Sequence, residues 1–473
     1  MPGRHSSVPY PHFRKASAMT DGKVPHHLDA QDERRMWRKI SFRIMPLIGL
    51  AFVVSYIDRA NLGYIAKPLS ADLGLTSAAL GLAGSLFFIG YILMEIPSNM
   101  MLERFGARIW ISRIVISWGL VTIVTAAVHS TTQLFIARIL LGIAEAGLSA
   151  GIILYLTFWF PKKQRAWAMS TFFLMIPISN IVGAPIAAAL LKWGEGLMGI
   201  SGWRSLFVVE GALTVLVGIV ILAFLPSRPK DAKWLSPEER TFIAETLEAE
   251  HREHSAHGAL TGMRQALTSG RIWALAVAFF AVVFGIYPLA FFLPTMIDTL
   301  NETIGSSANV SGVLLAAIPY VVALVAMIVW GRVGTRRSAV FSTTVPMTIG
   351  VIGLVSATFT QNGALFIVAV CVSVAGIYSA FAQFWRIPAI ALSGAAAAAG
   401  IALINSVSNT SGLVGPYLTG FIKDRTGSYT YALLLIAAVM VAGIVILLTV
   451  GRKAEQIGNH TPGDPSVPVA ERT

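Results

Sequence analysis

Twelve long apolar segments dominate this sequence, and short polar connections separate most of them. A membrane-crossing helix needs about 20 apolar residues, and in hydrocarbon its backbone must hydrogen-bond within its own segment. The sequence therefore predicts an all-α membrane protein with twelve transmembrane helices. The predicted spans are 44–66, 79–101, 109–127, 134–158, 166–191, 204–225, 273–299, 310–330, 338–358, 364–388, 398–421 and 429–450.

The composition excludes several other classes of protein. Only 13% of the 473 residues are charged and 55% are hydrophobic, whereas an average soluble domain is about 25% charged. So few charged residues cannot cover the surface of a soluble enzyme, and they are not typical of a disordered chain. They also argue against a nucleic-acid-binding module, although the net charge is +12. The single cysteine, Cys371, excludes a disulfide framework and a site with several thiolate ligands.

The distribution of basic residues predicts the orientation of the chain. Most of the 36 Lys and Arg residues fall in the two tails and in the loops after spans 2, 4, 6 and 8. Basic loops mark the cytoplasmic side of a membrane. We therefore expect both termini to be cytoplasmic and the protein to lie in the cytoplasmic (inner) membrane. The N-terminal 40 residues hold no apolar run, so we expect no cleavable signal peptide.

One long hydrophilic insert divides the spans into two groups of six. It contains LSPEERTFIAETLEAE, in which Ser236 and Glu239 form a capping box at the start of an amphipathic helix. The arrangement predicts two pseudo-symmetric six-helix halves. The expected divisions are a cytoplasmic tail (1–43), an N-terminal bundle (44–225), a cytoplasmic central loop (226–271), a C-terminal bundle (272–450) and a second cytoplasmic tail (451–473).

Four charged residues lie inside two of the predicted spans. Span 1 contains Asp58 and Arg59, and span 4 contains Arg138 and Glu145, which are seven residues apart and share one helix face with Gly142. A charge in hydrocarbon costs at least about 2.5–3.5 kcal/mol and marks a transport pathway by default. The alternative is a pair of salt bridges that only lock the two spans together. We favour a water-accessible cavity, with Gly142 leaving room for a neighbouring helix or a ligand.

The chemistry of these groups suits proton and anion handling. A carboxylate takes up a proton when isolated and releases it when an arginine approaches, and arginine holds a carboxylate with two parallel hydrogen bonds. All nine histidines lie in tails or loops, and we expect no metal at the HREHSAH run (251–257). Glu95 is expected to act as a gate or packing partner, and Glu210 as a hydrogen-bond partner between helices.

Several motifs of this chain resemble one transporter family. They are SYIDRANLGY, EIPSNMMLERFGAR, RILLGIAEAGLSAGIILYLTFWFPKKQRAWAM, ISGWRSLFVVEG and LPSRPKDAKWLSPEER. They resemble the anion:cation symporter branch of the major facilitator superfamily, which includes carriers of phthalate, tartrate, hydroxyphenylacetate and sugar acids. The resemblance covers about 40–450 and implies the twelve-helix fold of that superfamily.

The resemblance also implies roles for individual residues. Proton coupling falls to Asp58, Glu145 and Arg138, with Arg138 as the partner of Glu145. Substrate binding falls to Arg59, Tyr56, Tyr91, Asn180, Trp385 and Asn405. A cytoplasmic gate falls to Glu95, Asn99, Glu103, Arg104, Gly106 and Arg108, where Asn99 replaces the usual glycine of the loop motif. The alternative for each aromatic side chain is a place in the core or against lipid. Arg386 either lies at the cytoplasmic end of span 10 or supplies a second anion anchor.

The implied function is proton-coupled uptake of a small organic anion, a carboxylate, by alternating access. The partners are then the anion, protons and membrane lipid, with no cofactor and no nucleic acid, and a monomer suffices. The main alternative is a proton-driven exporter of drugs or metabolites on the same fold. A second alternative is an organophosphate exchanger. This hypothesis is weaker because a phosphate clamp of two arginines would need a basic residue in span 7, which contains none. A membrane enzyme would need a nucleophile or metal cluster near the interface, and the sequence shows none.

Overall fold

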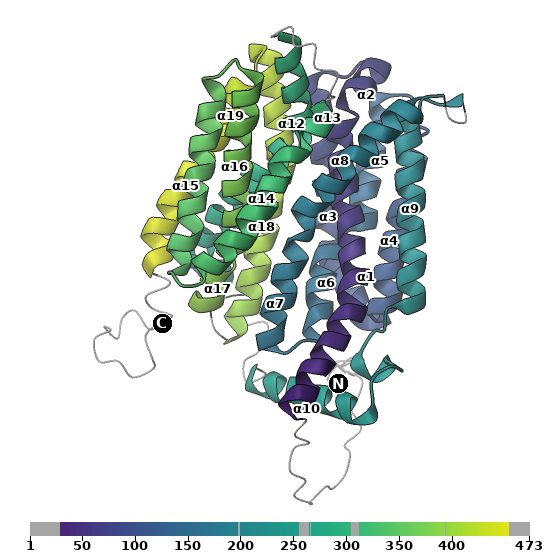
Figure 1. Cartoon of the computed structure of the whole chain (residues 1–473), viewed down its shortest axis with the longest axis vertical. Helices are drawn as coiled ribbons and strands as arrows, with labels where there is room; N and C mark the ends of the chain where they lie inside the picture. Colours follow the sequence, from purple (N-terminus) through teal and green to yellow (C-terminus); the bar gives the residue numbers. More distant parts are fainter. Residues whose placement is uncertain are drawn as a thin grey trace, which may run out of the picture.

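The chain folds mainly into helices, as Figure 1 shows for the computed structural model of the protein. The structure describes residues 29–196, 199–254, 264, 266–303, 312–392 and 394–453. No β-strand occurs in these ranges. The predicted all-α fold is therefore confirmed. Most of the two predicted tails (1–28 and 454–473) lies outside the described residues, and so does His257 of the histidine run.

Several spans in the first half of the chain consist of two consecutive helices. The elements are α1 (Ala30–Tyr64), α2 (Ala66–Leu73), α3 (Ser77–Phe105), α4 (Ala107–Thr125), α5 (Thr131–Glu145), α6 (Leu148–Thr157), α7 (Lys162–Phe173), α8 (Met175–Trp193) and α9 (Gly202–Phe224). The break between α5 and α6 lies at Gly147, whose φ of +84° suits glycine because a side chain is strained there. Glu145 is thus the last residue of α5, directly before this break.

The second half follows the long hydrophilic connecting region. The connection contains the 3₁₀ turn η2 (Pro229–Asp231) and α10 (Pro237–His254). The predicted capping box is present at its start, because the Ser236 hydroxyl accepts from the Glu239 amide and the Glu239 carboxylate accepts from the Ser236 amide. The remaining elements are α12 (Gly270–Thr303), α13 (Gly312–Leu315), α14 (Ala317–Gly334), α15 (Ala339–Thr358), α16 (Gly363–Phe384), α17 (Arg386–Ala391), α18 (Gly394–Thr426), α19 (Thr430–Ile446) and η3 (Leu447–Gly451).

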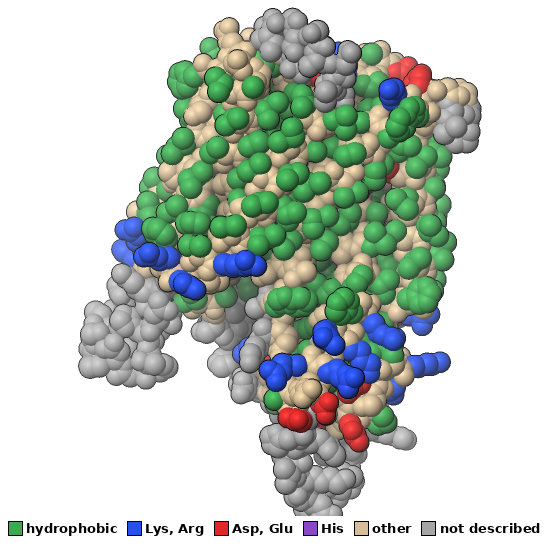
Figure 2. Space-filling view, in the orientation of Figure 1, with side chains coloured by type: hydrophobic (Ala, Val, Ile, Leu, Met, Phe, Trp, Pro, Cys, Tyr) green, Lys and Arg blue, Asp and Glu red, His purple; other side chains and the backbone are tan. Residues whose placement is uncertain are grey.

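The surface of the helical body is that of a multi-pass membrane protein. Among the described residues, eleven helical segments are long and apolar enough to cross a membrane, and they match eleven of the predicted spans. The remaining predicted span, 398–421, lies within α18. Figure 2 shows hydrophobic side chains over the middle of one face, while Lys and Arg gather toward the end that carries α10.

The two halves pack against each other through α1 with α12, α3 with α18, and α8 with α14. We call the two ends of the body the α2 end and the α10 end (Figure 1). At the α2 end the contact is closest where glycines face backbone of the other half. Gly63 faces Phe291, and Gly81 faces Pro416, with no room for a Cβ at either position. The halves are therefore closed together at the α2 end.

Candidate functional site

A small cavity lies between the two halves, and both halves contribute its walls. Its volume is about 70 Å³. The side chains that carry its polar chemistry are Tyr56, Arg59, Tyr91, Ser149, Tyr287, Trp385, Asn405, Ser408 and Asn409. Four of the residues expected at the substrate from the resemblance, besides Arg59, therefore line one cavity: Tyr56, Tyr91, Trp385 and Asn405.

The charged centre of the cavity wall is an ion pair between Arg59 on α1 and Glu145 on α5. Nη2 of Arg59 lies 2.7 Å from Oε1 of Glu145, and Nε donates a hydrogen bond of 2.8 Å to the same oxygen. The hydroxyl of Ser55 donates to this oxygen as well, at 2.7 Å. The Glu145 side chain is fully buried, and its Oε2 has no hydrogen-bond partner among the residues that the structure describes. A buried carboxylate oxygen is costly unless it finds a hydrogen-bond partner.

Aromatic rings surround the guanidinium of Arg59. Its Cζ lies 5.0 Å from the ring centre of Tyr91, 5.1 Å from that of Tyr56 and 5.2 Å from that of Phe87. Aromatic faces attract a cation, and the attraction is stronger where water is excluded. The rings therefore stabilise the positive charge of Arg59 at the cavity wall.

Arg138 does not pair with Glu145, which corrects the expectation from the sequence. Its Nε donates instead to the backbone oxygen of Ala83 at 3.3 Å, and its guanidinium lies 5.4 Å from the ring centre of Phe87. Arg138 is 2% exposed, and within the described ranges its Nη1 has no hydrogen-bond partner. The cation that pairs with Glu145 is Arg59, which comes from α1.

Asp58 points away from the cavity, into a polar cluster inside the first half. Its Oδ1 accepts from the Thr122 hydroxyl at 2.9 Å and from Nδ2 of Asn61 at 3.3 Å. The same Nδ2 donates to Oε2 of Glu210 at 3.0 Å, which confirms the expected helix-to-helix role of Glu210. One amide thus links two buried carboxylates, and each of them retains an oxygen that has no hydrogen-bond partner in the described part of the chain.

Asn180 on α8 does not line the cavity, in contrast to its expected role in substrate binding. It is 2% exposed, and its Oδ1 accepts from the Tyr64 hydroxyl at 3.3 Å. Its Nδ2 donates to the backbone oxygen of Ile176. These contacts make Asn180 a link between α1 and α8.

Glu95 connects the two halves on the α10 side of the cavity. Its Oε1 accepts from Nδ2 of Asn405 on α18 at 3.2 Å. The side chain of Asn99, one turn later on α3, donates to the backbone oxygen of Glu95. Because Asn405 belongs to the other half, this hydrogen bond has to break if the halves separate at the α10 end.

The loop motif between α3 and α4 contacts α9 and the segment after it, within its own half. Nε of Arg108 donates to the backbone oxygen of Leu222 at 2.5 Å, and its amide donates to the Ser227 hydroxyl. Gly106 has a φ of +84°. Neither Glu103 nor Arg104 forms an ion pair within the described part of the chain. The motif therefore bridges neighbouring helices through Arg108.

Arg386 lies outside the central cavity and binds the turn that follows α14. Its Nη1 donates to the backbone oxygen of Gly334 at 2.9 Å, and its Nη2 donates to that of Arg337 at 3.1 Å. Of the two expectations for Arg386, the geometry fits a position at the α10 end of span 10. Its hydrogen bonds satisfy carbonyl groups that a helix end leaves without partners.

Sequence reasoning missed three residues of this region. Tyr287 on α12 lines the cavity, although span 7 drew attention only for its lack of basic residues. Ser55 and Asn61 flank the charged pair in SYIDRANLGY, three residues before and after Asp58. Since residues three apart on a helix are neighbours, this spacing was the available signal for Asn61.

Comparison with known proteins agrees with this architecture. A family profile described as Major Facilitator Superfamily matches residues 48–416, and one described as Vacuole effluxer Atg22 like matches 401–456. A solved structure, "Partially occluded inward open conformation of the xylose transporter XylE from E. coli", superposes with a TM-score of 0.67 at 15% identity over 86% of this chain and 97% of that one. This likeness shows the fold.

Relatives with higher identity carry transporter names. A "Putative tartrate transporter" of Agrobacterium vitis is 39% identical over 92% of this chain and 94% of its own length. A "Putative metabolite transport protein NicT" of Pseudomonas putida is 35% identical, over 89% and 95%. A "Quinolone resistance transporter" of Acinetobacter baumannii is 34% identical, over 91% and 98%. The protein is thus a transporter and not an enzyme. The chain belongs to the major facilitator superfamily.

Proposed function

We propose that the protein is a proton-coupled symporter that takes up a small organic anion across the cytoplasmic membrane. The observation that carries this proposal is the Arg59–Glu145 ion pair at the wall of the central cavity. Arginine keeps its proton, so a substrate carboxylate has a permanent cation to bind. The carboxylate of Glu145 competes with the substrate carboxylate for Arg59, and Glu145 can lose its negative charge by taking up a proton.

Protonation of Glu145 is the proposed coupling step. A neutral Glu145 no longer holds Arg59, whose two nitrogens on one side then bind a substrate carboxylate in parallel. The aromatic residues Tyr56 and Tyr91 keep the guanidinium in place during the exchange. By linkage, protonation raises substrate affinity by the same factor by which substrate raises proton affinity. Asp58 on α1 is the second proposed proton site. Arg138 on α5 is the second cation that we propose to take part in proton coupling.

Alternating access is proposed to proceed by rocking of the two halves about the cavity. The halves are closed at the α2 end, and Glu95 joins Asn405 on the α10 side. Because the basic side chains gather at the α10 end (Figure 2), we assign that end to the cytoplasm, with both termini there. Each chain contains a complete cavity, so the proposed unit of transport is a monomer.

The test is transport by the purified protein in liposomes. A thermal-shift screen with tartrate and other organic anions first selects the substrate, because a bound ligand stabilises the folded protein. Radiolabelled substrate is then expected to accumulate only when the pH is lower outside. Glu145→Gln should abolish this accumulation but retain counterflow, whereas Glu238→Gln, at an exposed position of α10, should behave as wild type. Accumulation that ignores the pH gradient would show that proton coupling is wrong.

A second candidate function is proton-driven export, which the similarity to the quinolone resistance transporter favours. The two functions differ in direction. An exporter would expel a preloaded compound from liposomes when the pH is lower outside, and it would prefer neutral or cationic cargo. Arg59, which lines the cavity, favours an anion instead.

A further inference from the structure

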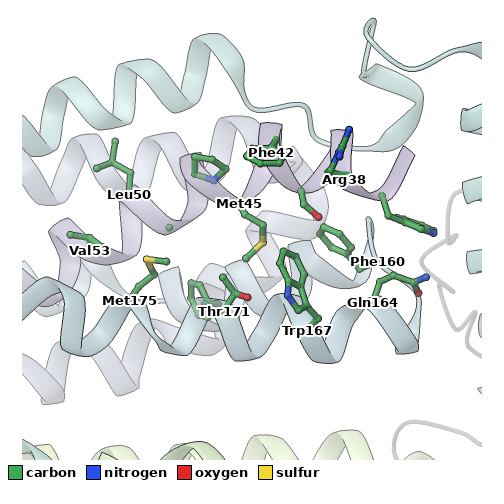
Figure 3. A pocket seen from close by; sticks show the side chains of 15 residues that line it. Arg38, Phe42, Met45, Leu50, Val53, Phe160, Gln164, Trp167, Thr171 and Met175 are labelled. Atoms are coloured by element: carbon green, nitrogen blue, oxygen red, sulfur yellow. The ribbon is translucent and has the colours of Figure 1, made fainter. Parts of the chain in front are cut away.

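A second, larger hollow lies on the outer surface of the first half, between α1 and the α7–α8 pair (Figure 3). Its volume is about 870 Å³. From Arg38 to Val53 it follows fifteen residues of α1, or roughly 22 Å at 1.5 Å per residue. One leaflet of a bilayer contributes about half of the 30 Å hydrocarbon core, so this groove is as long as one leaflet with part of its head-group layer.

The groove is apolar over most of its length and open on one side. Met45, Leu50, Val53 and Met175 line the part far from α10. Leu50 is 43% exposed, so the rim faces the same surroundings as the apolar belt of Figure 2. Gly49 lies in the groove wall, where a Cβ would stand 3.6 Å from the Met175 sulfur.

The opposite end of the groove is polar and contains one lining cation, Arg38. Figure 3 shows Arg38, Gln164 and Trp167 grouped at that end. Trp167 is 53% exposed, as expected for an aromatic ring at the head-group level. Arg38 also borders an adjoining hollow with Arg34 and Arg35. None of these arginines forms an ion pair within the residues that the structure describes. Asp32 is the acidic residue of that hollow. A second hollow beside Arg38 also contains Glu238 and Glu239, so Arg38 is the cation that lines the groove itself, while charges of both signs lie beyond it.

The floor of the groove adjoins the central cavity. Phe172 lines both spaces. Its ring centre lies 3.9 Å from that of Phe52, which also lines the cavity. An occupant of the groove would therefore contact the back of the aromatic wall of the central site.

We propose that this groove binds one anionic phospholipid of the cytoplasmic leaflet. An acyl chain lies along the apolar part, and the phosphate of the head group meets Arg38. A membrane lipid fits because the open side of the groove faces the apolar belt, where the surrounding molecules are lipids. It also fits because the one charged residue that lines the groove, Arg38, lies at the α10 end. This binding site is additional to the proposed transport function. Only the choice of leaflet rests on the orientation proposed above, in which the α10 end is cytoplasmic.

The test is native mass spectrometry of the full-length protein in detergent, with phosphatidylglycerol and phosphatidylcholine as competing probes. The wild type is expected to retain one phosphatidylglycerol in preference to phosphatidylcholine. Arg38→Gln should weaken phosphatidylglycerol binding by about fivefold, whereas Arg332→Gln, an exposed arginine near the end of α14, should have no effect. Gly49→Leu fills the groove and should displace both lipids.

Two results would overturn the proposal. One is equal binding of the two lipids by the wild type, and the other is an equal loss with Arg38→Gln and Arg332→Gln. A photoreactive phosphatidylglycerol provides a measurement that does not depend on variants. It should crosslink to peptides of α1 and α7, and labelling spread over all exposed helices would contradict the assignment. Thermal unfolding of each variant confirms that it is folded.

Discussion

Asp424, near the end of α18, accepts hydrogen bonds from the backbone amides of Ser77 and Ala78 at the start of α3. The two distances are 3.0 and 2.7 Å. The start of a helix carries unpaired amides and a partial positive charge, which a carboxylate satisfies. Since α18 and α3 belong to different halves, this side chain from one half caps a helix of the other and holds the α2 end closed.

Removal of this cap should favour opening at the α2 end. Asp424→Ala is expected to cost the closed state about 1 kcal/mol, roughly a fivefold shift in population. Electron paramagnetic resonance distances between spin labels at positions 71 and 425, in a background with Cys371→Ala, measure the shift. The same substitution at the exposed Asp32 is the control, and an unchanged distance distribution for Asp424→Ala would contradict the role of the cap.

The pH dependence of this contact has a definite sign. Partial burial of Asp424 favours its protonated form, but the hydrogen bonds from Ala78 and Ser77 outweigh this and lower the pKa of its carboxyl group. A lowered pKa means that the contact is at full strength above the ordinary value of about 3.9 and weakens only as the pH falls below it. The spin-label distances should therefore not respond to Asp424 between pH 5 and 8. A response in that range that disappears in Asp424→Ala would be inconsistent with this pKa.

The Arg59–Glu145 pair should show strong energetic coupling. Arg59→Met leaves the buried Glu145 charge without its partner, which costs about 3–5 kcal/mol. The double variant Arg59→Met/Glu145→Met should be more stable than Arg59→Met alone, because no uncompensated charge remains. Thermal unfolding in detergent measures both. Lys39→Met, which breaks the partly exposed pair with Glu239, should cost less than about 1 kcal/mol.

Gly142 is predicted to be required for packing between α5 and α3. A Cβ at this position would collide with the backbone of Phe87 and Tyr91, so Gly142→Ala should destabilise the protein by about 1–3 kcal/mol. Gly331 on α14 has nothing within 4 Å of such a Cβ, and Gly331→Ala should be neutral or stabilising. Equal unfolding temperatures for the two variants would show that the α3–α5 contact relaxes freely.

Arg386 should matter for stability and not for substrate binding. Arg386→Lys loses the planar group that reaches both Gly334 and Arg337, so its unfolding temperature should fall. Arg59→Lys should instead raise the KM for the transported anion, because an ammonium cannot bind a carboxylate with two parallel hydrogen bonds. If Arg386→Lys raises KM without a change in unfolding temperature, Arg386 is an anion anchor.

The sequence by itself determined the membrane-spanning helices and the presence of charges among them. Both follow from hydropathy, which is a local property of the sequence. Eleven predicted spans match helices of the described residues, and the predicted intramembrane residues Glu145 and Arg138 are buried. The tertiary structure decided which charges meet. Glu145 pairs with Arg59, which is 86 residues away in sequence, and not with Arg138 on its own helix.

The same division applies to the rest of the candidate site. Tyr91 and Trp385 line the cavity, as the resemblance implied. Asn180 does not line it and is hydrogen-bonded to Tyr64, whereas Tyr287, which was not predicted, is a lining residue. A residue's side of a helix can be read from its spacing, but the neighbour that this side meets depends on how the helices are rotated and tilted against each other. That arrangement is set by packing across the whole bundle, such as the contact of Gly142 with α3, and no single segment encodes it.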